Sequence, residues 1–253
     1  MLTRVIKVGG RVQSDAALPE AIAGAWKTTN GALCLIHGGG DEISALQRAI
    51  GQEPQFIGGR RVTTERDLDI IRMALSGSSN KRLVARLLDA GIPAVGISGE
   101  DGALITATPV DPERLGHVGT PTAIRTSLLR ALMREGYLPV ISPVARSATN
   151  GAPLNVNGDD AAAAIASALS ATDLLFLADV PGVLDGGTPL SSLDAETAQA
   201  LIADGRAAGG MAAKLASAIR AAELGVPSVR IGGLDAVTDP FSGTTITLAP
   251  SLA

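Results

Sequence analysis

RLLDAGIPAVGIS, residues 86–98, has the pattern of a helix end joined to the start of a buried strand. Gly91 supplies the left-handed conformation that closes a helix, and Pro93 prevents the helix from restarting. The same order of helix, glycine, proline and strand returns in ALMREGYLPVIS (131–142) and RAAELGVPSVRIGG (220–233). The copies are irregularly spaced, so we interpret them as repeated αβ units and not as a solenoid.

Short apolar runs alternate with longer helical patterns along the chain. The predicted strands are 4–8, 32–36, 93–98, 138–142, 173–179, 228–231 and 244–248. The predicted helices lie near 15–28, 41–50, 64–76, 79–90, 121–135, 159–170, 194–204 and 210–224. This alternation, with continuously apolar strands, predicts an α/β fold: a three-layer αβα sandwich whose central, mostly parallel sheet is covered on both faces.

A flap and a lobe boundary complete the predicted organisation. The segment 99–119 is less helical and contains GEDG and GHVG, which indicates a hairpin-rich flap. A chain of 253 residues can form one large α/β domain or two lobes that share a sheet. We expect an N-terminal lobe over 1–171 and a C-terminal lobe over 172–253 on one continuous sheet.

The composition excludes several classes of protein. Hydrophobic residues make up 46% of the chain, aromatic residues only 2%, and the net charge is −4, with no basic tract. These values argue against nucleic acid as the main partner. The single cysteine, Cys34, excludes an internal disulfide framework and fits a reducing compartment. We see no leader segment and no apolar run long enough to span a membrane, so we expect a cytoplasmic protein.

Two predicted strands end directly in glycines, in IKVGG (6–10) and LCLIHGGGDEIS (33–44). Glycines at the carboxyl end of a strand let backbone N–H groups approach an anion, and a following helix N-terminus adds partial positive charge. No Gly-Lys dipeptide and no G-x-G-x-x-G follows a strand, so a Walker A loop and a dinucleotide fingerprint are both absent. The glycines could also serve only to turn the chain.

Two lysines and one aspartate are candidates for phosphate chemistry. Lys7 precedes Gly9–Gly10 within an apolar strand, and Lys214 lies in the helix that follows Gly209–Gly210. A strand lysine often lies at an exposed edge, and a helix lysine is often solvated, but both could neutralise an anion. Asp159 in NVNGDDAAAAIASAL (155–169) could be a plain N-cap, or it could hold both ammonium groups.

The remaining candidate residues lie in loops. Asp179, in FLADVPGVLDGG (176–187), follows a strand and suggests a loop that contacts a nucleotide. Arg60 and Arg61 precede a predicted helix, and an arginine fork suits a carboxylate, although paired arginines are also common on surfaces. His37 and His117 are far apart in the sequence, so we predict no protein-held metal site and a structural role for His37.

Taken in order, these motifs resemble the amino-acid kinase family and, within it, the acetylglutamate kinase branch. The resemblance covers nearly the whole chain. Its motifs are K-x-G-G (7–10), HGGG (37–40), G-x-R-V-T around Arg61, N-K (80–81), GHVG (116–119), GYLPVISP (136–143), NVNGDDAA (155–162), DVPGVL (179–184) and GGM-x-x-K (209–214). Gly158 stands where the family usually has alanine, and the Val-Thr after Arg61 favours Arg61 over Arg60 as the substrate arginine.

The resemblance implies the amino-acid kinase fold and a role for each matching residue. Lys7 and Lys214 would contact the transferring phosphoryl group, Asp159 would organise both lysines, and Gly10 and Gly39 would donate N–H groups. The implied substrate-binding residues are Gly38, Gly39, Gly40, Arg61 and Asn155. The implied nucleotide-binding residues are Lys7, Gly9, Gly10, Asp179, Gly182, Gly209, Gly210, Met211 and Lys214. The N-terminal lobe would bind the amino-acid substrate and dimerise, and the C-terminal lobe would bind the nucleotide.

The implied reaction is the ATP-dependent phosphorylation of the side-chain carboxylate of N-acetyl-L-glutamate in arginine biosynthesis. Mg²⁺ would be held mainly by the nucleotide phosphates. One alternative is a kinase for another N-acyl or carrier-protein-linked glutamate or aminoadipate; a second is a catalytically inactive amino-acid sensor. Arginine-sensitive relatives carry an extra N-terminal helix that joins dimers into hexamers, and strand 4–8 lies too near Met1 for it. We therefore expect a homodimer that arginine does not inhibit.

Overall fold

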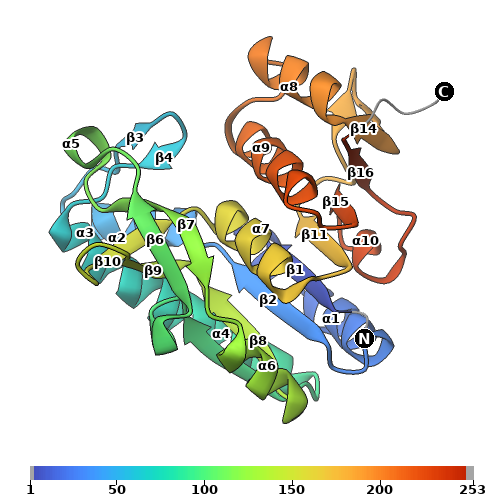
Figure 1. The fold of residues 1–253 in the computed structure, drawn as a ribbon, viewed down its shortest axis with the longest axis horizontal. Helices are drawn as coiled ribbons and strands as arrows, with labels where there is room; N and C mark the ends of the chain where they lie inside the picture. Colours follow the sequence, from blue (N-terminus) through green and yellow to red (C-terminus); the bar gives the residue numbers. More distant parts are fainter. Residues whose placement is uncertain (1–2, 249–253) are drawn as a thin grey trace.

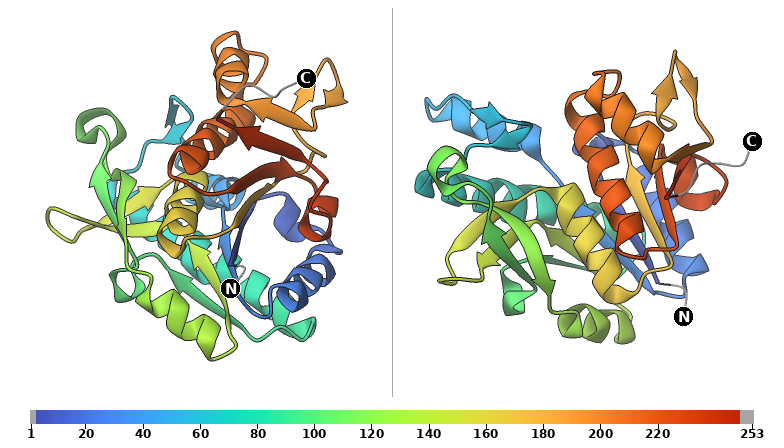
Figure 2. Two further views of the ribbon diagram at one scale, coloured as in Figure 1. Left: turned by 45° about the vertical axis from the view of Figure 1, so that its right-hand side comes forward. Right: turned by 45° about the horizontal axis from the view of Figure 1, so that its top comes forward.

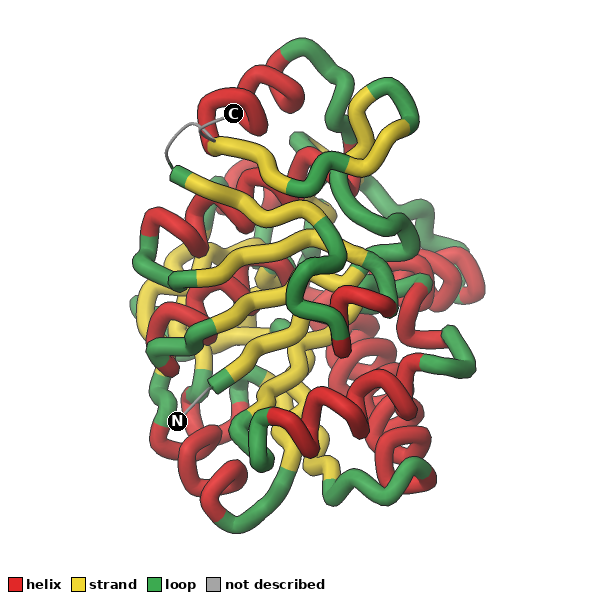
Figure 3. The backbone as a smooth tube through the Cα atoms, turned by 90° about the vertical axis from the view of Figure 1, so that its right-hand side faces the viewer, coloured by secondary structure: helices red, strands yellow, loops and turns green. Residues whose placement is uncertain are grey.

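The computed structural model describes residues 3–248, and its centre is a twisted eight-stranded sheet (Figures 1 and 3). The strands lie in the order β14 (Ser192–Asp194), β16 (Thr244–Thr247), β15 (Ser228–Gly232), β11 (Asp173–Leu177), β1 (Arg4–Val8), β2 (Leu33–His37), β8 (Leu138–Ser142) and β5 (Ala94–Ser98). Neighbouring strands run parallel except for β15 and β16. The prediction of a mostly parallel central sheet is confirmed.

Helices cover both faces of this sheet, because alternate residues of each strand point to opposite sides. Ile6 and Val8 pack with one layer, formed by α1 (Leu18–Thr28), α4 (Asn80–Asp89) and α10 (Asp235–Thr238). Val5 and Phe176 pack with the other layer, formed by α6 (Ser127–Arg134), α7 (Gly158–Leu169), α8 (Ala195–Ala203) and α9 (Gly209–Glu223). The predicted three-layer αβα sandwich is therefore confirmed.

The three glycine–proline junctions have the conformation that the sequence predicts. Gly91, Gly136 and Gly225 all have positive φ, at 77°, 77° and 85°. At each one, two backbone N–H groups bond back to the last turn of the helix, as Gly91 and Ile92 do with Leu88 and Leu87. This is the Schellman arrangement, which satisfies carbonyl groups at the helix end and directs the chain into the next strand.

A four-stranded closed barrel lies beside the sheet. It consists of β10 (Pro153–Val156), β7 (Val118–Ile124), β6 (Ile105–Pro109) and β9 (Val144–Ser147). β6 and β7 form an antiparallel hairpin around the short helix α5 (Pro112–Leu115), which confirms the hairpin predicted for the flap. The predicted helix at 121–135 was wrong over its first six residues, because 121–124 belong to β7 and α6 begins only at Ser127. Pro121 and the β-branched residues Thr120, Thr122 and Ile124 suit a strand that pairs with β6.

The predicted helices at 64–76 and 79–90 form one continuous helical segment. α3 (Glu65–Ile71) passes into the π-helical segment η2 (Arg72–Ser79), which passes into α4. Thr64 caps α3 in a capping box with Asp67. The other predicted strands and helices lie within three residues of their predicted bounds, including α2 (Gly40–Ala49).

Several short elements lie outside the central sheet and the barrel. They are η1 (Val12–Ser14), η3 (Asp101–Ala103), and the hairpins β3 (Phe56–Ile57) with β4 (Arg60–Arg61) and β12 (Leu184–Asp185) with β13 (Thr188–Pro189). The β3–β4 hairpin and α9 lie on opposite sides of α7 (Figures 1 and 2). Between residues 3 and 248, we find no helix that is both long and apolar enough to cross a membrane.

Candidate active site

The three central strands carry the glycine and aspartate loops that the sequence singles out. β1 lies between β11 and β2, parallel to both, with Val8 opposite Leu177 and His37. The loops that follow these strands therefore meet at one edge of the sheet. They bring Gly9–Gly10, Gly38–Gly40 and Asp179 together, at the edge where open α/β sheets bind ligands.

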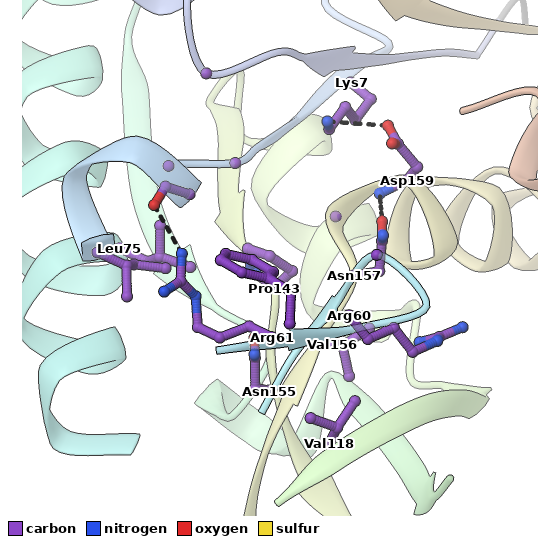
Figure 4. A pocket seen from close by; sticks show the side chains of 18 residues that line it. Lys7, Arg60, Arg61, Leu75, Val118, Pro143, Asn155, Val156, Asn157 and Asp159 are labelled. Carbon is purple, nitrogen blue, oxygen red and sulfur yellow. Dashed lines mark hydrogen bonds and ion pairs between the residues drawn. The ribbon is translucent and has the colours of Figure 1, made fainter. Parts of the chain in front are cut away.

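Lys7 points to the α7 face of the sheet, because it shares the side-chain parity of Val5 and not that of Ile6 and Val8. Only 8% of the surface of Lys7 is exposed to solvent. Its ammonium group forms an ion pair of 2.9 Å with Oδ1 of Asp159 in the first turn of α7 (Figure 4). Lys7 is thus a buried, paired cation and not an exposed-edge lysine.

Lys214 reaches the same carboxylate oxygen from α9. Its Nζ lies 3.2 Å from Oδ1 of Asp159, and both residues are buried. Burial opposes the ionisation of Asp159, but Lys7 and Lys214 outweigh it and hold the pKa of this carboxyl below its ordinary value. Burial, reinforced by the charge of Lys7, lowers the pKa of Lys214 to about 8, although Asp159 opposes the shift. The cluster holds two cations against one anion, which leaves a net positive charge for a ligand.

Two cavities meet at this cluster. The first, of about 240 Å³, is lined by Lys7, Gly10, Gly38–Gly40, Arg61, Asn155 and Asp159, among others. The second, of about 430 Å³, is lined by Lys7, Gly9, Gly10, Asp159, Asp179, Gly210, Met211 and Lys214, among others. Lys7, Gly10 and Asp159 belong to both walls. Two ligands, one in each cavity, would therefore face each other across Lys7.

Arg61 is held firmly on the wall of the first cavity. Its guanidinium donates to the Gly40 carbonyl oxygen at 2.8 Å, to Ser44 Oγ at 2.8 Å and to Gln47 Oε1, all on α2. It also lies 4.7 Å from the centroid of the Phe56 ring. These contacts orient the cation toward α2, as Figure 4 shows. Asn155 of β10, on the same wall, donates to Thr63 Oγ1 at 3.0 Å.

The backbone N–H groups of the glycine loops fall into two sets. Gly9 N–H bonds to the Leu177 carbonyl and Gly38 N–H bonds to the Val8 carbonyl, so these two tie the loops to neighbouring strands. Within residues 3–248, the N–H groups of Gly10 and Gly39 have no partner. Unpaired N–H groups on a cavity wall are ready donors for an anion.

Two helices that begin at the cavities lack side-chain caps. α2 begins at Gly40 on the first cavity, and α9 begins next to Gly210 on the second. α1 and α6, which line neither cavity, also lack side-chain caps, whereas α3, α7 and α8 are capped by Thr64, Asn157 and Asp194. An uncapped helix N-terminus offers several free N–H groups and partial positive charge. Each cavity therefore has a wall suited to phosphate or carboxylate oxygens.

Steric contacts explain two glycines of the site. A Cβ at Gly39 would lie 2.5 Å from Leu75 Cδ2 of the π-helical segment, which lines the same cavity. A Cβ at Gly158 would lie 3.3 Å from Lys7 Cε. The glycine at position 158 thus leaves more room around the Lys7 side chain than alanine would, and the turn accepts it as the first residue of α7.

Two predicted nucleotide residues line neither cavity. Gly182 lies against β16, where an added Cβ would approach Thr244 Oγ1 to 2.6 Å. Gly209 has a φ of 54° and is the first residue of α9, so it shapes the turn into that helix. The structure brings the other predicted residues together on the two walls.

His37 is locked in a buried network beside the site. Its Nδ1 lies 2.9 Å from the Gly38 carbonyl oxygen and its Nε2 lies 3.1 Å from Asn80 Nδ2. Because a carbonyl only accepts, Nδ1 carries the proton, and Nε2 accepts from the amide. Burial lowers the pKa of His37 to about 4, so the ring is neutral at pH 7. This arrangement holds the loop at Gly38 and leaves no nitrogen free to act as a base.

Sequence reasoning missed several residues that hold the lining side chains in place, and one, Arg11, that lines the second cavity. Ser44 and Gln47 of α2 hold Arg61, Thr63 holds Asn155, and Arg11 pairs with Asp179 at 3.1 Å in the second cavity. The positions of Ser44 and Gln47, four and seven residues after Gly40, place them on one face of α2. That spacing indicates a shared polar face of α2. Only the fold shows that Arg61 of β4 packs against this face.

The described part of the chain, residues 3–248, contains no group of three or more His, Cys, Asp or Glu side chains that could hold a metal ion. Asp159 is engaged by two ammonium groups, and Asp179 is paired with Arg11. This donor set fits a metal ion that enters with phosphate ligands of its own.

Comparison with known proteins gives consistent matches. The model of the amino acid kinase family matches residues 3–233. The acetylglutamate kinase of Geobacillus kaustophilus (strain HTA426) is 40% identical over 232 residues, which cover 90% of this chain and 89% of the relative. The acetylglutamate kinase of Roseiflexus sp. (strain RS-1) is 42% identical over 246 residues, which cover 96% of this chain and 93% of the relative. A crystal structure of smu.665 from Streptococcus mutans UA159 superposes with a TM-score of 0.88 at 28% identity, covering 98% of this chain and 99% of that one.

Proposed function

Because this chain belongs to the amino acid kinase family, we propose that it transfers the γ-phosphoryl group of ATP to the side-chain carboxylate of N-acetyl-L-glutamate, in arginine biosynthesis. The observation that carries the proposal is the Lys7–Asp159–Lys214 cluster at the junction of the two cavities. All three side chains are present and in contact, which argues against an inactive amino-acid sensor.

The acceptor would occupy the cavity beside Arg61, and the nucleotide would occupy the cavity beside Lys214. Arg61 and Asn155 would bind the α-carboxylate and acyl-amide region, and Gly38–Gly40 would cradle the reacting end. Asp179, Gly210 and Met211 would lie on the nucleotide side. We propose that the N-terminal lobe, residues 1–171, binds the acceptor and that the C-terminal lobe, residues 172–253, binds the nucleotide, with Lys7, Gly9, Gly10 and Asp159 of the N-terminal lobe also lining the nucleotide cavity.

The main obstacle to the reaction is charge repulsion. A side-chain carboxylate is already ionised at pH 7 and needs no general base. Two anions ~4 Å apart at an effective dielectric of ~20 repel by roughly 4 kcal/mol. Lys7, Lys214 and the free N–H groups of Gly10 and Gly39 would offset this repulsion and stabilise the charge of the transferring group.

The carboxylate oxygen would attack the γ-phosphorus as the bond to the β-phosphate oxygen breaks, giving an acyl phosphate and ADP. Asp159 would keep both ammonium groups at the point of transfer without contacting substrate. Mg²⁺, held by the nucleotide phosphates and water, would neutralise further charge on those phosphates. We further propose a cytoplasmic homodimer, which stays a prediction.

An ATP-dependent hydroxamate assay tests the proposed function, because hydroxylamine traps acyl phosphates. The panel contains N-acetyl-glutamate, N-succinyl-glutamate, free glutamate, and carrier-protein-linked glutamate and aminoadipate. We expect N-acetyl-L-glutamate to have the highest kcat/KM. A carrier-linked substrate with a higher value would replace the proposed substrate with the carrier-linked alternative, and no trapped product from any acceptor would contradict kinase activity.

Arg61→Lys is expected to raise KM for the acceptor by about ten- to a hundredfold and to change kcat less. A lysine cannot reproduce the contacts to Gly40, Ser44 and Gln47 together, nor the planar fork that suits a carboxylate. Steady-state kinetics with each substrate varied in turn measure the effect. Arg48→Lys, at an exposed position of α2, is the matched control and should leave both KM values unchanged. A rise in KM for ATP alone would mean that the two cavities are assigned the wrong way round.

A further inference from the structure

Asp160, next to Asp159 in α7, holds partners from two separate parts of the molecule. Its Oδ2 accepts from Arg60 Nη2 of the β3–β4 hairpin at 3.0 Å, and its Oδ1 accepts from Ser217 Oγ of α9 at 2.8 Å. The Asp160 side chain is only 12% exposed, and Ser217 is buried. Asp160 lines neither of the two cavities of the candidate site. It is therefore a link between elements and not a group that touches substrate.

On the α9 side, the contact between Asp160 and Ser217 helps to position Lys214. Ser217 follows Lys214 by three residues, so the two side chains are neighbours on one face of the helix. The consecutive carboxylates of α7 hold both of them: Asp159 holds Lys214 and Asp160 holds Ser217. Two contacts one helical turn apart add to the packing of the buried apolar face of α9 in setting how the helix is rotated about its axis, and therefore where the Lys214 ammonium lies.

On the hairpin side, the link bears on the acceptor cavity. Arg60 and Arg61 are adjacent in β4, and their side chains extend in opposite directions: Arg61 toward α2, and Arg60 away from it (Figure 4). In the described chain, from residue 3 to 248, Asp160 is the only hydrogen-bond partner of the Arg60 side chain, whose Nη1 is buried without a partner. The position of the hairpin, which carries Arg61, is thus tied to α7 through Asp160.

We propose that Asp160 is a positioning residue that couples acceptor binding beneath the β3–β4 hairpin to nucleotide binding beside α9. The assignment of the two cavities rests on the proposed function. A bound acceptor stabilises the hairpin position in which Arg60 meets Asp160. The carboxylate, oriented by Arg60, holds Ser217 and with it the face of α9 that carries Lys214. Because such coupling is reciprocal, bound nucleotide strengthens acceptor binding by the same factor.

The test is the dissociation constant of a non-hydrolysable ATP analogue, measured by calorimetry with and without saturating acceptor. The acceptor is whichever compound the wild-type protein turns over in the hydroxamate panel, so a different substrate would not obscure the result. In the wild-type protein we expect the acceptor to tighten nucleotide binding at least about fivefold. In Asp160→Asn and in Ser217→Ala this factor should fall close to one.

Ser167→Ala is the matched control for these variants. Ser167 of α7 donates to the Leu224 carbonyl at the end of α9 at 3.2 Å, so the variant also removes a contact between α7 and the α9 segment, but not one that reaches the hairpin. It should keep the wild-type coupling factor. The proposal is overturned if the wild-type protein shows no coupling, if Ser217→Ala retains it, or if Ser167→Ala loses it to the same extent.

Discussion

Lys7→Met is expected to lower kcat by about 10²–10³-fold and to change KM for the acceptor little. Lys7 belongs to the walls of both cavities, and its ammonium lies beside the point where the phosphoryl group would pass. Methionine has a similar length but no charge, so it removes the electrostatic stabilisation of the transferring group. Loss of one preorganised donor to a developing negative charge typically costs about 2.7–4 kcal/mol, which corresponds to this range.

Steady-state kinetics in the hydroxamate assay measure the effect of Lys7→Met. Lys27→Met is the matched control, because Lys27 is an exposed residue in the last turn of α1. The control should keep the wild-type kcat. A wild-type kcat in Lys7→Met, with the substitution verified and the fold intact, would remove Lys7 from the transfer step.

Asp159→Asn is expected to lower kcat by at least about 10²-fold and to move the alkaline limb of the pH profile to lower pH. Asparagine has no charge to hold the two ammonium groups at the point of transfer, and a 10²-fold loss corresponds to about 2.7 kcal/mol of activation barrier. In the wild-type protein Lys214, with a pKa of about 8, must be protonated to neutralise phosphate, so kcat/KM for ATP should fall as pH rises through 8. Asp159 opposes the lowering of this pKa, so its loss should start the fall at lower pH.

The matched control for Asp159→Asn is Asp173→Asn. Asp173 is the first residue of β11 and lies beside Arg4 at the start of β1, whereas Asp159 pairs with Lys7 near the end of β1. Asp173 is a carboxylate that holds two cations in the same way, at 2.6 Å from Arg4 and 3.2 Å from Arg230, but it lines neither cavity. Asp173→Asn should lower the free energy of unfolding and leave the pH profile unchanged. An identical shift of the alkaline limb in both variants would show that Lys214 does not set it.

Local sequence patterns were sufficient to predict the strands of the main sheet and most of the helices that cover it. Gly91, Gly136 and Gly225 close their helices in the predicted conformation, because a helix end followed by proline depends on neighbouring residues alone. The barrel strand β7 was partly missed, because its conformation depends on pairing with β6 and β10. The π-helical join between α3 and α4 was also missed, because Leu75 and Ser79 lie against Gly39 of a distant loop.

In the candidate site, too, some residues were predictable from the sequence and others were not. Lys7, Asp159, Lys214 and Arg61 were identifiable because their motifs combine glycine loops, helix starts and charge. Asn155 was identified only through the family resemblance. Their supporting residues were not identifiable, because Ser44, Gln47 and Thr63 acquire meaning only from the side chain that each one meets.

The sequence by itself determined the order of elements, the glycine loops at the strand ends and the identity of the charged residues, because these depend on short-range conformational preferences. The sequence offered Asp159 either as a plain N-cap or as a carboxylate that holds both ammonium groups, and the tertiary structure decided between the two: one oxygen of Asp159 meets two lysines that lie 207 positions apart. It also decided that Asp160 joins the hairpin to α9. Such contacts arise because the sheet places β1 beside α7 and α9, and no local pattern along the chain encodes which distant side chains will meet.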